Sequence, residues 1–191
     1  MSQATNVKLQ KIVVLGPEST GKSTLCAALA KHYQTIWCKE YAREYLSKNG
    51  TAYTYENLLT IAKGQLANEE AAIETAITKL NNGGTNKLII DTDMYVMKVW
   101  SEYVFNNCDP FILEQINERT YDLYLLCDID LPWTSDEMRE YPDELPRKEL
   151  FMIYKDLLVN QTTPWAVVSG IGDDRTNNAI RVIEQQLGTT K

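Results

Sequence analysis

The 191-residue sequence contains little of what several functional classes require. It has one histidine, and none of its four cysteines forms a C-x-x-C pair, so the usual spacings of zinc ligands are absent. Lys and Arg total 19 against 26 Asp and Glu, which gives a formal net charge of −7 without any basic stripe. Because proteins bind nucleic-acid phosphates mainly through Lys and Arg, this composition argues against a nucleic-acid partner.

Long apolar runs are missing too. No stretch is long enough to span a bilayer, and the polar N-terminus lacks the apolar core of a signal peptide. Scattered cysteines without a pairing pattern are typical of reduced thiols in the cytosol. We therefore expect a cytoplasmic protein with no membrane partner, folded as a single domain over residues 1–191. Its oligomeric state is left open by the sequence.

Apolar strand patterns alternate with segments of helical periodicity along the chain. This alternation predicts an α/β protein with three layers, in which helices cover both faces of a five-stranded parallel sheet. The longest helical pattern runs from about residue 54 to 80. The five strand segments are Lys11–Leu15, Thr35–Cys38, Lys87–Asp91, Tyr121–Cys127 and Trp165–Ser169. The other helical segments are Met94–Phe105, Pro110–Arg119, Arg147–Asn160 and Asn177–Leu187.

Residues 131–146, "LPWTSDEMREYPDELP", interrupt this alternation. The segment is charged and carries three prolines, and so long a polar excursion after the fourth strand predicts a lid over an active site. The alternative is a solvated surface loop. Arg139 lies in this segment and Arg147 just after it, where an arginine could stabilise the negative charge of phosphoryl transfer. Surface arginines are also common, so spacing alone does not decide their role.

The stretch "GPESTGKST" at residues 16–24 follows the first apolar strand and matches the phosphate-loop pattern G-x-x-x-x-G-K-S. Its glycines let the backbone N–H groups turn inward, and the following helix adds its positive N-terminal end. Lys22 is expected to reach the β- and γ-phosphates of ATP, and Ser23 to coordinate Mg²⁺. The predicted ATP-binding residues of the loop are Gly16, Glu18, Ser19, Thr20, Gly21, Lys22, Ser23 and Thr24.

Acidic residues follow two of the predicted strands. Asp91 ends the apolar "LIID" and suits a metal-organising carboxylate, whereas Asp93 opens the next helix and could serve as its N-cap. Which of the two organises the metal stays open. Glu40 follows the second strand on the edge where α/β sheets bind ligands, and it could accept the proton of a substrate hydroxyl. Arg43 could hold a phosphate or the substrate, although an exposed Glu–Arg pair is the alternative.

Five motifs occur in order with suitable gaps: "GPESTGKSTLCAALA", "KEYAREYL", "IAKGQ", "IIDTD" with "VWSE", and "DIDLPWTSDEMR". Over roughly residues 10–187 the chain resembles the nicotinamide riboside kinase domain of bacterial NadR-type proteins. The resemblance implies a fold like that of P-loop nucleoside-monophosphate kinases. It also implies transfer of the ATP γ-phosphate to the 5′-hydroxyl of nicotinamide riboside, which gives nicotinamide mononucleotide. The implied partner is this small riboside, and the implied cofactor is Mg²⁺.

The same resemblance implies roles for individual residues. Gln65 becomes a candidate for the nicotinamide end, with a polar residue on the helix surface as the alternative. Tyr41 and Trp100 could stack on a flat ring, although core packing is the alternative for Trp100. The stretch "GDDR" at residues 172–175 resembles the family's loop near the ATP adenine, which makes Arg175 a candidate there, and capping of the last helix by Asp173 or Asp174 is the alternative. The implied catalytic residues are Lys22, Glu40, Asp91 and Arg139, and the implied metal ligands are Ser23 and Asp91. Beyond the loop, the implied ATP-binding residues are Arg139, Arg147 and Arg175. The implied substrate-binding residues are Glu40, Tyr41, Arg43, Gln65, Asp93 and Trp100.

Some parts of the NadR type are absent. Adenylyl transfer needs a His-x-Gly-His-like motif, whereas the single histidine, His32, is followed by Tyr33. The phosphate loop begins at residue 16, which leaves no room before it for a helix-turn-helix. We therefore expect neither an adenylyltransferase nor a DNA-binding domain. A kinase for another nucleoside or small metabolite, and an ATP-binding regulatory switch without a substrate, remain the alternatives.

Overall fold

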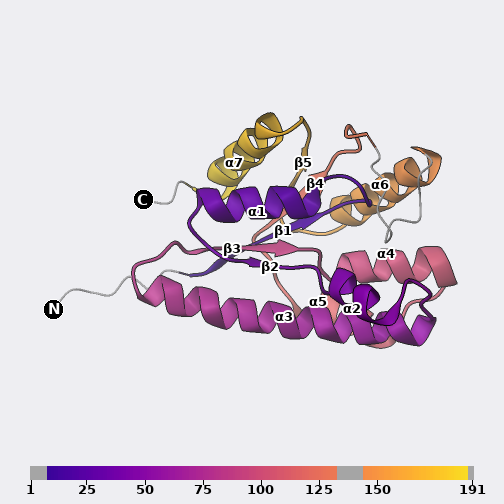
Figure 1. The fold of residues 1–191 in the computed structure, drawn as a ribbon. Coiled ribbons are helices and arrows are strands. Elements are labelled where there is room, and N and C mark those ends of the chain that lie inside the picture. Colours follow the sequence, from indigo (N-terminus) through magenta and orange to yellow (C-terminus); the bar gives the residue numbers. More distant parts are fainter. Residues whose placement is uncertain (1–7, 133–143, 189–191) are drawn as a thin grey trace.

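A computed structural model describes residues 8–132 and 144–188, so most of the predicted lid, including Arg139, lies outside the described residues. Five parallel strands form one sheet in the order β2-β3-β1-β4-β5 (Figure 1). This architecture confirms the predicted α/β class with a five-stranded parallel sheet. The strands are β1 (Gln10–Leu15), β2 (Trp37–Cys38), β3 (Lys87–Asp91), β4 (Leu123–Cys127) and β5 (Trp165–Val168).

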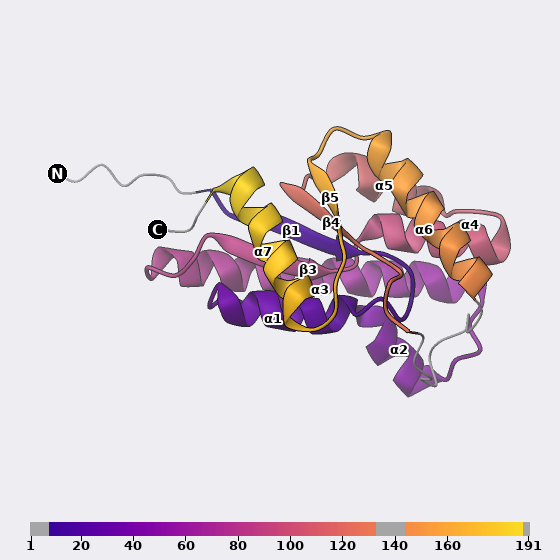
Figure 2. The same cartoon turned by 90° about the horizontal axis from the view of Figure 1, so that it is seen from above.

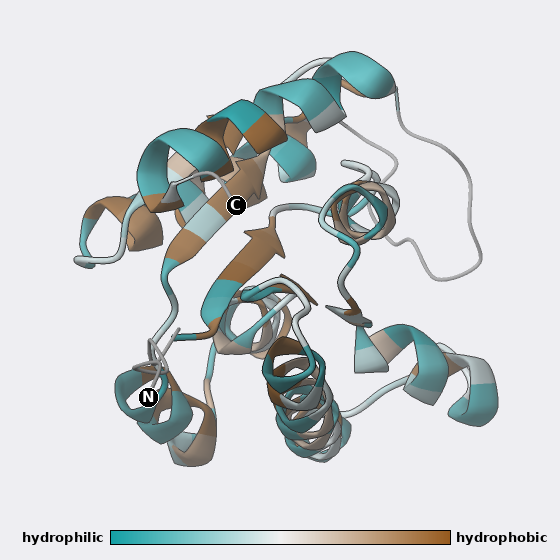
Figure 3. Cartoon of the chain, turned by 90° about the vertical axis from the view of Figure 1, so that its left-hand side faces the viewer, coloured by the Kyte–Doolittle hydropathy of each residue, from teal (hydrophilic) through white to brown (hydrophobic). Residues whose placement is uncertain are grey.

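The side chains of the central strand alternate between two apolar layers, as the pleat of a strand requires. Ile12 and Val14 pack against α1 (Lys22–His32) and α7 (Asp173–Leu187), which lie side by side in the view from above (Figure 2). Val13 and Leu15 face the opposite layer. That layer is formed by α3 (Tyr55–Asn81), α4 (Met94–Phe105) and α6 (Glu144–Val159). Figure 3 shows the apolar strands, in brown, enclosed between the helices.

A third apolar cluster lies beside the sheet. Helices α2 (Tyr41–Asn49) and α5 (Pro110–Glu118) pack there with α3 and α4 around residues such as Leu58, Met94 and Ile112. Leu58 and Met94 are 1% exposed and Ile112 is fully buried, so these helices are fixed to one another. This cluster positions α2 and α4 at the carboxyl end of the sheet, next to the phosphate loop.

Several predicted boundaries differ from the structure by one to four residues, and β4, for example, begins at Leu123 rather than Tyr121. Strand β2 has two residues rather than four, because it is an edge strand that pairs with β3 alone. Helix α6 begins at Glu144 rather than Arg147, since Pro146 lies in the first turn, where proline is tolerated. Helix α7 begins at Asp173 rather than Asn177, with two aspartates in a first turn that favours negative charge. No helix of the described residues is long and apolar enough to cross a bilayer.

Candidate active site

The phosphate loop connects β1 to α1 and closes tightly on itself. Its backbone turns through positive φ at Gly16 (139°) and Gly21 (76°), and a Cβ at Gly16 would lie 3.0 Å from the Cys127 carbonyl oxygen. The hydroxyl of Thr20 and the ammonium of Lys22 each donate to the Pro17 carbonyl oxygen at 2.8 Å. No side chain caps the N-terminus of α1, and its first turn carries no acidic residue. The exposed N–H groups and the positive helix end therefore suit a phosphate.

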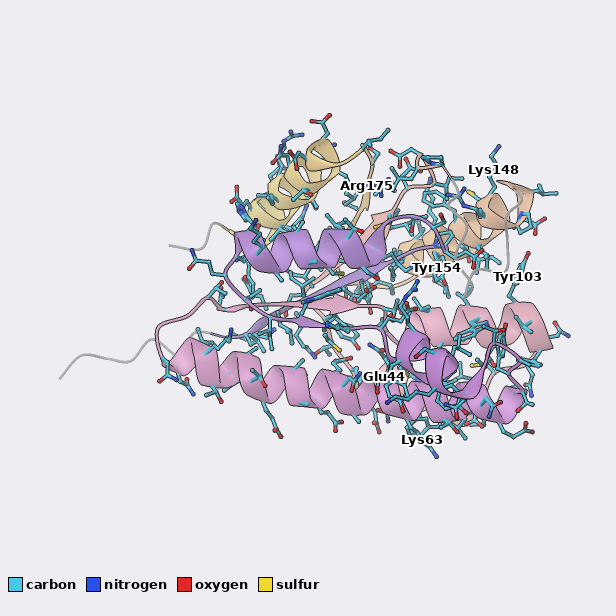
Figure 4. All side chains as sticks on the ribbon, in the orientation of Figure 1. Glu44, Lys63, Tyr103, Lys148, Tyr154 and Arg175 are labelled. Atoms are coloured by element: carbon cyan, nitrogen blue, oxygen red, sulfur yellow. The ribbon has the colours of Figure 1, made fainter. Side chains whose placement is uncertain are left out.

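A cavity of about 390 Å³ extends from this loop toward α2, α4 and α6. All nine residues from Gly16 to Thr24 line its phosphate end. In Figure 4, Tyr103 rises from α4 toward α6, and its hydroxyl donates to Glu149 at 3.2 Å. Ten residues from the three helices and the turn before α2 line the other end, and they are Glu40, Ala42, Arg43, Leu46, Val96, Val99, Trp100, Tyr103, Leu150 and Tyr154.

Asp91 ends β3 beside the loop and is 1% exposed. Neither carboxylate oxygen meets a hydrogen-bond partner of good distance and angle within the described part of the chain. Burial, and then the nearby charge of Glu40, raise the pKa of Asp91 to about 6, while the Ser23 hydroxyl and the charges of Lys22 and Arg43 act in the opposite direction. A buried carboxylate whose nearest donor, the Ser23 hydroxyl, does not form a hydrogen bond of good geometry calls for an explanation, and a cation supplies one.

The donor set at this point fits Mg²⁺. The Ser23 hydroxyl and the Asp91 carboxylate are oxygen donors, which Mg²⁺ prefers, and Mg²⁺ normally completes its shell with waters and substrate phosphates. Residues 8–132 and 144–188 contain no group of three or more acidic, histidine or cysteine side chains that could hold a metal ion. Ser23 and Asp91 are therefore the residues that would hold the ion.

Asp93 is placed differently. Its Oδ1 accepts from the Tyr95 N–H and its Oδ2 from the Tyr124 hydroxyl, both at 3.1 Å, so it serves as the N-cap of α4. Burial raises its pKa to about 7. Asp93 does not line the cavity, and both of its oxygens bond inside the protein. Asp93 thus caps α4, as the alternative for this residue had it, and Asp91 is the aspartate that borders the loop; a substrate contact by Asp93 stays a prediction.

Glu40 and Arg43 lie where the two carboxyl ends of β2 and β3 meet the loop. Glu40 is the last residue before α2 and is half-buried, and its side chain makes no capping hydrogen bond to that helix. Arg43 follows in the first turn and is exposed. Both residues also line a second cavity of about 350 Å³, on the β2 side, which Asp91 and Ser23 border as well. Glu40 thus lies between Asp91 on one side and the helix-lined end of the first cavity on the other.

Trp100 lines the cavity, and its ring contacts Tyr53. Its indole N–H donates to the Tyr53 hydroxyl at 2.8 Å, and the two rings meet edge to face with centroids 4.8 Å apart. Trp100 therefore lines the cavity and also packs against a neighbouring aromatic ring. Its stacking on a substrate ring stays a prediction. Tyr41 and Gln65, in contrast, are not among the residues that line the cavity. Gln65 is 2% exposed, and its amide bonds the backbone of neighbouring segments.

Two of the predicted ATP-binding arginines, Arg147 and Arg175, are not among the residues that line the cavity. Arg175 is 4% exposed and donates to the carbonyl oxygens of Thr20 at 3.1 Å and Gly170 at 2.8 Å, and it forms an ion pair with Asp130. Figure 4 shows it between α7 and the sheet. Arg147 is 5% exposed and donates to the Leu131 carbonyl oxygen at 3.1 Å. Both contacts fix backbone around the loop. The structure therefore does not support ATP contact by either side chain.

Sequence reasoning did not include Pro17 of the loop, and it missed several residues at the other end of the cavity. All are apolar or aromatic and lie on helices, where their pattern is the same as that of core residues. No sequence signal separates a helix face that lines a cavity from one that packs in the core. The missed residues are Ala42, Leu46, Val96, Val99, Tyr103, Leu150 and Tyr154.

The sheet order, together with a phosphate loop between β1 and α1, defines a P-loop protein with a nucleoside-kinase-like fold. The chain belongs to the AAA domain family, whose model matches residues 11–175. It is 26% identical over 186 residues to the trifunctional NAD biosynthesis/regulator protein NadR of Escherichia coli (strain K12), covering 94% of this chain and 43% of that protein. The Salmonella typhimurium protein of the same name matches to the same extent. The chain thus spans less than half the length of these curated relatives.

Solved structures carry the same fold. A NadR protein in complex with NR superimposes with a TM-score of 0.73 at 20% identity, over 94% of this chain and 51% of that one. Thymidylate kinase from Ehrlichia chaffeensis gives a TM-score of 0.62 at 15% identity, over 94% and 99%. Together with the curated relatives, these matches confirm the resemblance to the NadR type and to small nucleoside and nucleotide kinases in fold.

Proposed function

We propose that the protein is an ATP-dependent kinase that transfers the γ-phosphoryl group to the 5′-hydroxyl of nicotinamide riboside and so forms nicotinamide mononucleotide for NAD salvage. One observation carries the proposal: a single cavity joins the phosphate loop to an aromatic wall, with Glu40 between them. The cavity volume of about 390 Å³ suits a small ligand. The NadR relatives, one of them solved with NR, support nicotinamide riboside as the acceptor.

At the donor end, the residues act by holding phosphate. The loop N–H groups and the N-terminus of α1 bind the β- and γ-phosphates of ATP, and Lys22 releases the Pro17 carbonyl to reach the same oxygens. Mg²⁺, held by Ser23 and Asp91, would neutralise charge on those phosphates. Because these groups stand in place before the reaction, they stabilise the charge of the transition state without reorganising.

At the acceptor end, Glu40 orients the 5′-hydroxyl and accepts its proton, since it is the carboxylate that lines the cavity between the loop and the aromatic wall. Trp100, held by Tyr53, offers a fixed ring face for the flat base of the riboside. Arg43, at the start of α2, is close enough to lower the pKa of Asp91 and is placed to meet a phosphate.

Incubation with Mg-ATP and a panel of ribosides tests the proposal, with products identified by mass spectrometry. The panel contains nicotinamide riboside, adenosine, deoxyadenosine, thymidine and cytidine. We expect the 5′-monophosphate of nicotinamide riboside in excess over all others. If only another nucleoside is phosphorylated, the assignment of nicotinamide riboside as substrate is wrong and the assignment as a kinase stands. The panel includes thymidine and deoxyadenosine because the fold resembles those of a thymidylate kinase and a deoxyadenosine kinase. No transfer to any acceptor would favour a regulatory nucleotide-binding role.

A further inference from the structure

The side-chain amide of Gln65 joins three separate segments beneath the active site. Its Oε1 accepts from the backbone N–H of Tyr41 at 2.8 Å. Its Nε2 donates to the carbonyl oxygens of Thr92 at 3.1 Å and Asp91 at 3.3 Å, and lies 3.7 Å from the Cys38 sulfur. Each polar atom of this buried amide is thereby used inside the protein, so none is left for a ligand.

The segments joined in this way carry the two carboxylates of the site. Tyr41 directly follows Glu40, and adjacent Cα atoms are fixed about 3.8 Å apart, so a bond to the Tyr41 N–H also fixes the backbone of Glu40. Asp91 is bonded through its own carbonyl group. Glu40 and Asp91 line the same cavity on the β2 side, so the two carboxylates repel each other when both are charged. A buried amide that bonds both segments holds them together against that repulsion.

Thr92 has a strained backbone conformation, which the hydrogen bond from Gln65 also helps to stabilise. Its φ of 68° lies in the left-handed region, which a β-branched residue rarely adopts. Such a strained conformation persists only when surrounding contacts hold it. Here the Thr92 N–H donates to the Val14 carbonyl at 3.0 Å, and its own carbonyl accepts from Gln65. The turn allows Asp91 to face the loop while Asp93 turns back to cap α4.

The residue before Gln65 makes this geometry possible. Gly64 lies in the middle of α3, where glycine normally weakens a helix. A Cβ at this position would lie 2.1 Å from Cε1 of the Tyr41 ring. The missing side chain therefore lets the ring lie directly on α3 and brings the Tyr41 N–H within reach of the Gln65 amide. The pair Gly64–Gln65, the "GQ" of "IAKGQ", acts as one unit.

We propose that Gln65 is a positioning residue that sets the spacing between Glu40 and Asp91 and does not touch the acceptor. This replaces the substrate contact expected from the resemblance. The kinetic part of the proposal rests on the proposed function, because it needs a phosphoryl acceptor. A binding measurement that needs no turnover tests the same contact at Asp91.

Two substitutions remove the contact in different ways. Gln65→Met keeps the approximate length and loses every hydrogen bond, whereas Gln65→Glu keeps an acceptor for Tyr41 and loses the donors to Asp91 and Thr92. Because misplacement by about 1 Å can cost roughly 10²-fold in rate, we expect kcat to fall about tenfold to a hundredfold. KM for the acceptor should stay within about twofold, and the fold-loss should be the same for every acceptor used. Gln185→Glu, exposed on α7, is the control and should behave like the wild type.

A loss that appears mainly in KM, or only with the nicotinamide-bearing acceptor, would overturn the proposal in favour of direct substrate contact. Gly64→Ala is the second route, because it displaces the Tyr41 ring without altering the amide. It should give the same fall in kcat at unchanged KM, and it decides the matter if the Gln65 variants do not fold. Wild-type kcat and KM in folded Gln65→Met would equally overturn the proposal.

Thermal shift with a non-hydrolysable ATP analogue gives the readout that does not need catalysis. In the wild type, adding Mg²⁺ should increase the stabilisation by the analogue. We expect this Mg²⁺-dependent increment to shrink in Gln65→Met while the Mg²⁺-free shift, which depends on the loop and Lys22, is retained. An increment equal to that of the wild type would contradict the positioning of Asp91. This result stands even if no riboside in the panel is phosphorylated, so failure of the proposed function and of this proposal are distinguishable.

Discussion

At the phosphate end of the cavity, nine consecutive residues supply the whole lining, whereas at the acceptor end α2, α4 and α6 each contribute a few side chains between residues 40 and 154. The phosphate end works mainly through backbone N–H groups, whose direction is set by the local loop conformation. The acceptor end works through side chains, whose positions depend on how separate helices pack. Donor chemistry is thus encoded locally, and acceptor recognition depends on the tertiary structure.

Glu40→Gln should show the largest difference between the two ends of the cavity, because it should lower kcat without changing KM for ATP. The amide keeps the size of the side chain and cannot take a proton, so kcat should fall roughly 10²- to 10⁴-fold while KM for ATP stays near the wild-type value. Steady-state kinetics with saturating Mg-ATP measures this. Glu74→Gln, exposed on α3, is the matched control and should leave both constants unchanged. An unchanged kcat in Glu40→Gln would remove this residue from catalysis.

Trp100→Ala weakens the acceptor end alone. Stacking of a base on an aromatic side chain is worth about 1–3 kcal/mol, so KM for the riboside should rise on the order of tenfold or more. KM for ATP should not change, since the loop does not depend on this ring. Trp100→Phe should recover most of the loss. If Trp100→Ala raised KM for both substrates equally, the separation of the two ends would be wrong.

Asp91→Asn should affect activity and stability in opposite directions. The carboxylate is buried without a hydrogen-bond partner in the described residues, so replacing it with a neutral group should raise the free energy of unfolding of the free protein by about 1–3 kcal/mol at pH 8. Urea denaturation measures this change, and the same variant should bind Mg-ATP more weakly. A variant that is less stable than the wild type would indicate that Asp91 is satisfied inside the free protein.

The free energy of unfolding should also depend on pH. Burial raises the pKa of Asp93 from 3.8 to about 7 and that of Asp91 to about 6, so the folded protein keeps protons that the unfolded chain has already lost. The free energy of unfolding should therefore fall as pH rises from about 4 to about 7 and level off above that. Asp93→Asn, which retains an oxygen for the helix cap, should reduce this slope. The same slope in both proteins would contradict the role of Asp93.

The contrast between the two ends also explains what the sequence could predict. The phosphate loop, β3 at Lys87–Asp91 and α4 at Met94–Phe105 followed directly from local patterns, and the structure has the same bounds for both elements. The position of Asp91 beside the loop can be predicted because this residue ends a strand. Such features depend on neighbours in sequence, so a short motif is enough to specify them.

Gln65 and Arg175 show where sequence reasoning reached its limit. Periodicity places a residue on a helix face, but it does not say whether that face meets a cavity or the ends of strands. Gln65 turns toward β2 and β3 because Gly64 lets Tyr41 pack on α3, and Arg175 turns under the loop because backbone carbonyl groups converge there. Both outcomes depend on segments far away in the chain, and a single motif does not contain them.

The fate of the terminal phosphoryl group of ATP tests the central claim most directly. ATP labelled in that group is incubated with the protein, Mg²⁺ and nicotinamide riboside, and the label is followed by chromatography and mass spectrometry. The account predicts that the label appears in nicotinamide mononucleotide and that Glu40→Gln slows this transfer roughly 10²- to 10⁴-fold. Label found only in inorganic phosphate or in unchanged ATP, with the folded wild-type protein, would contradict it.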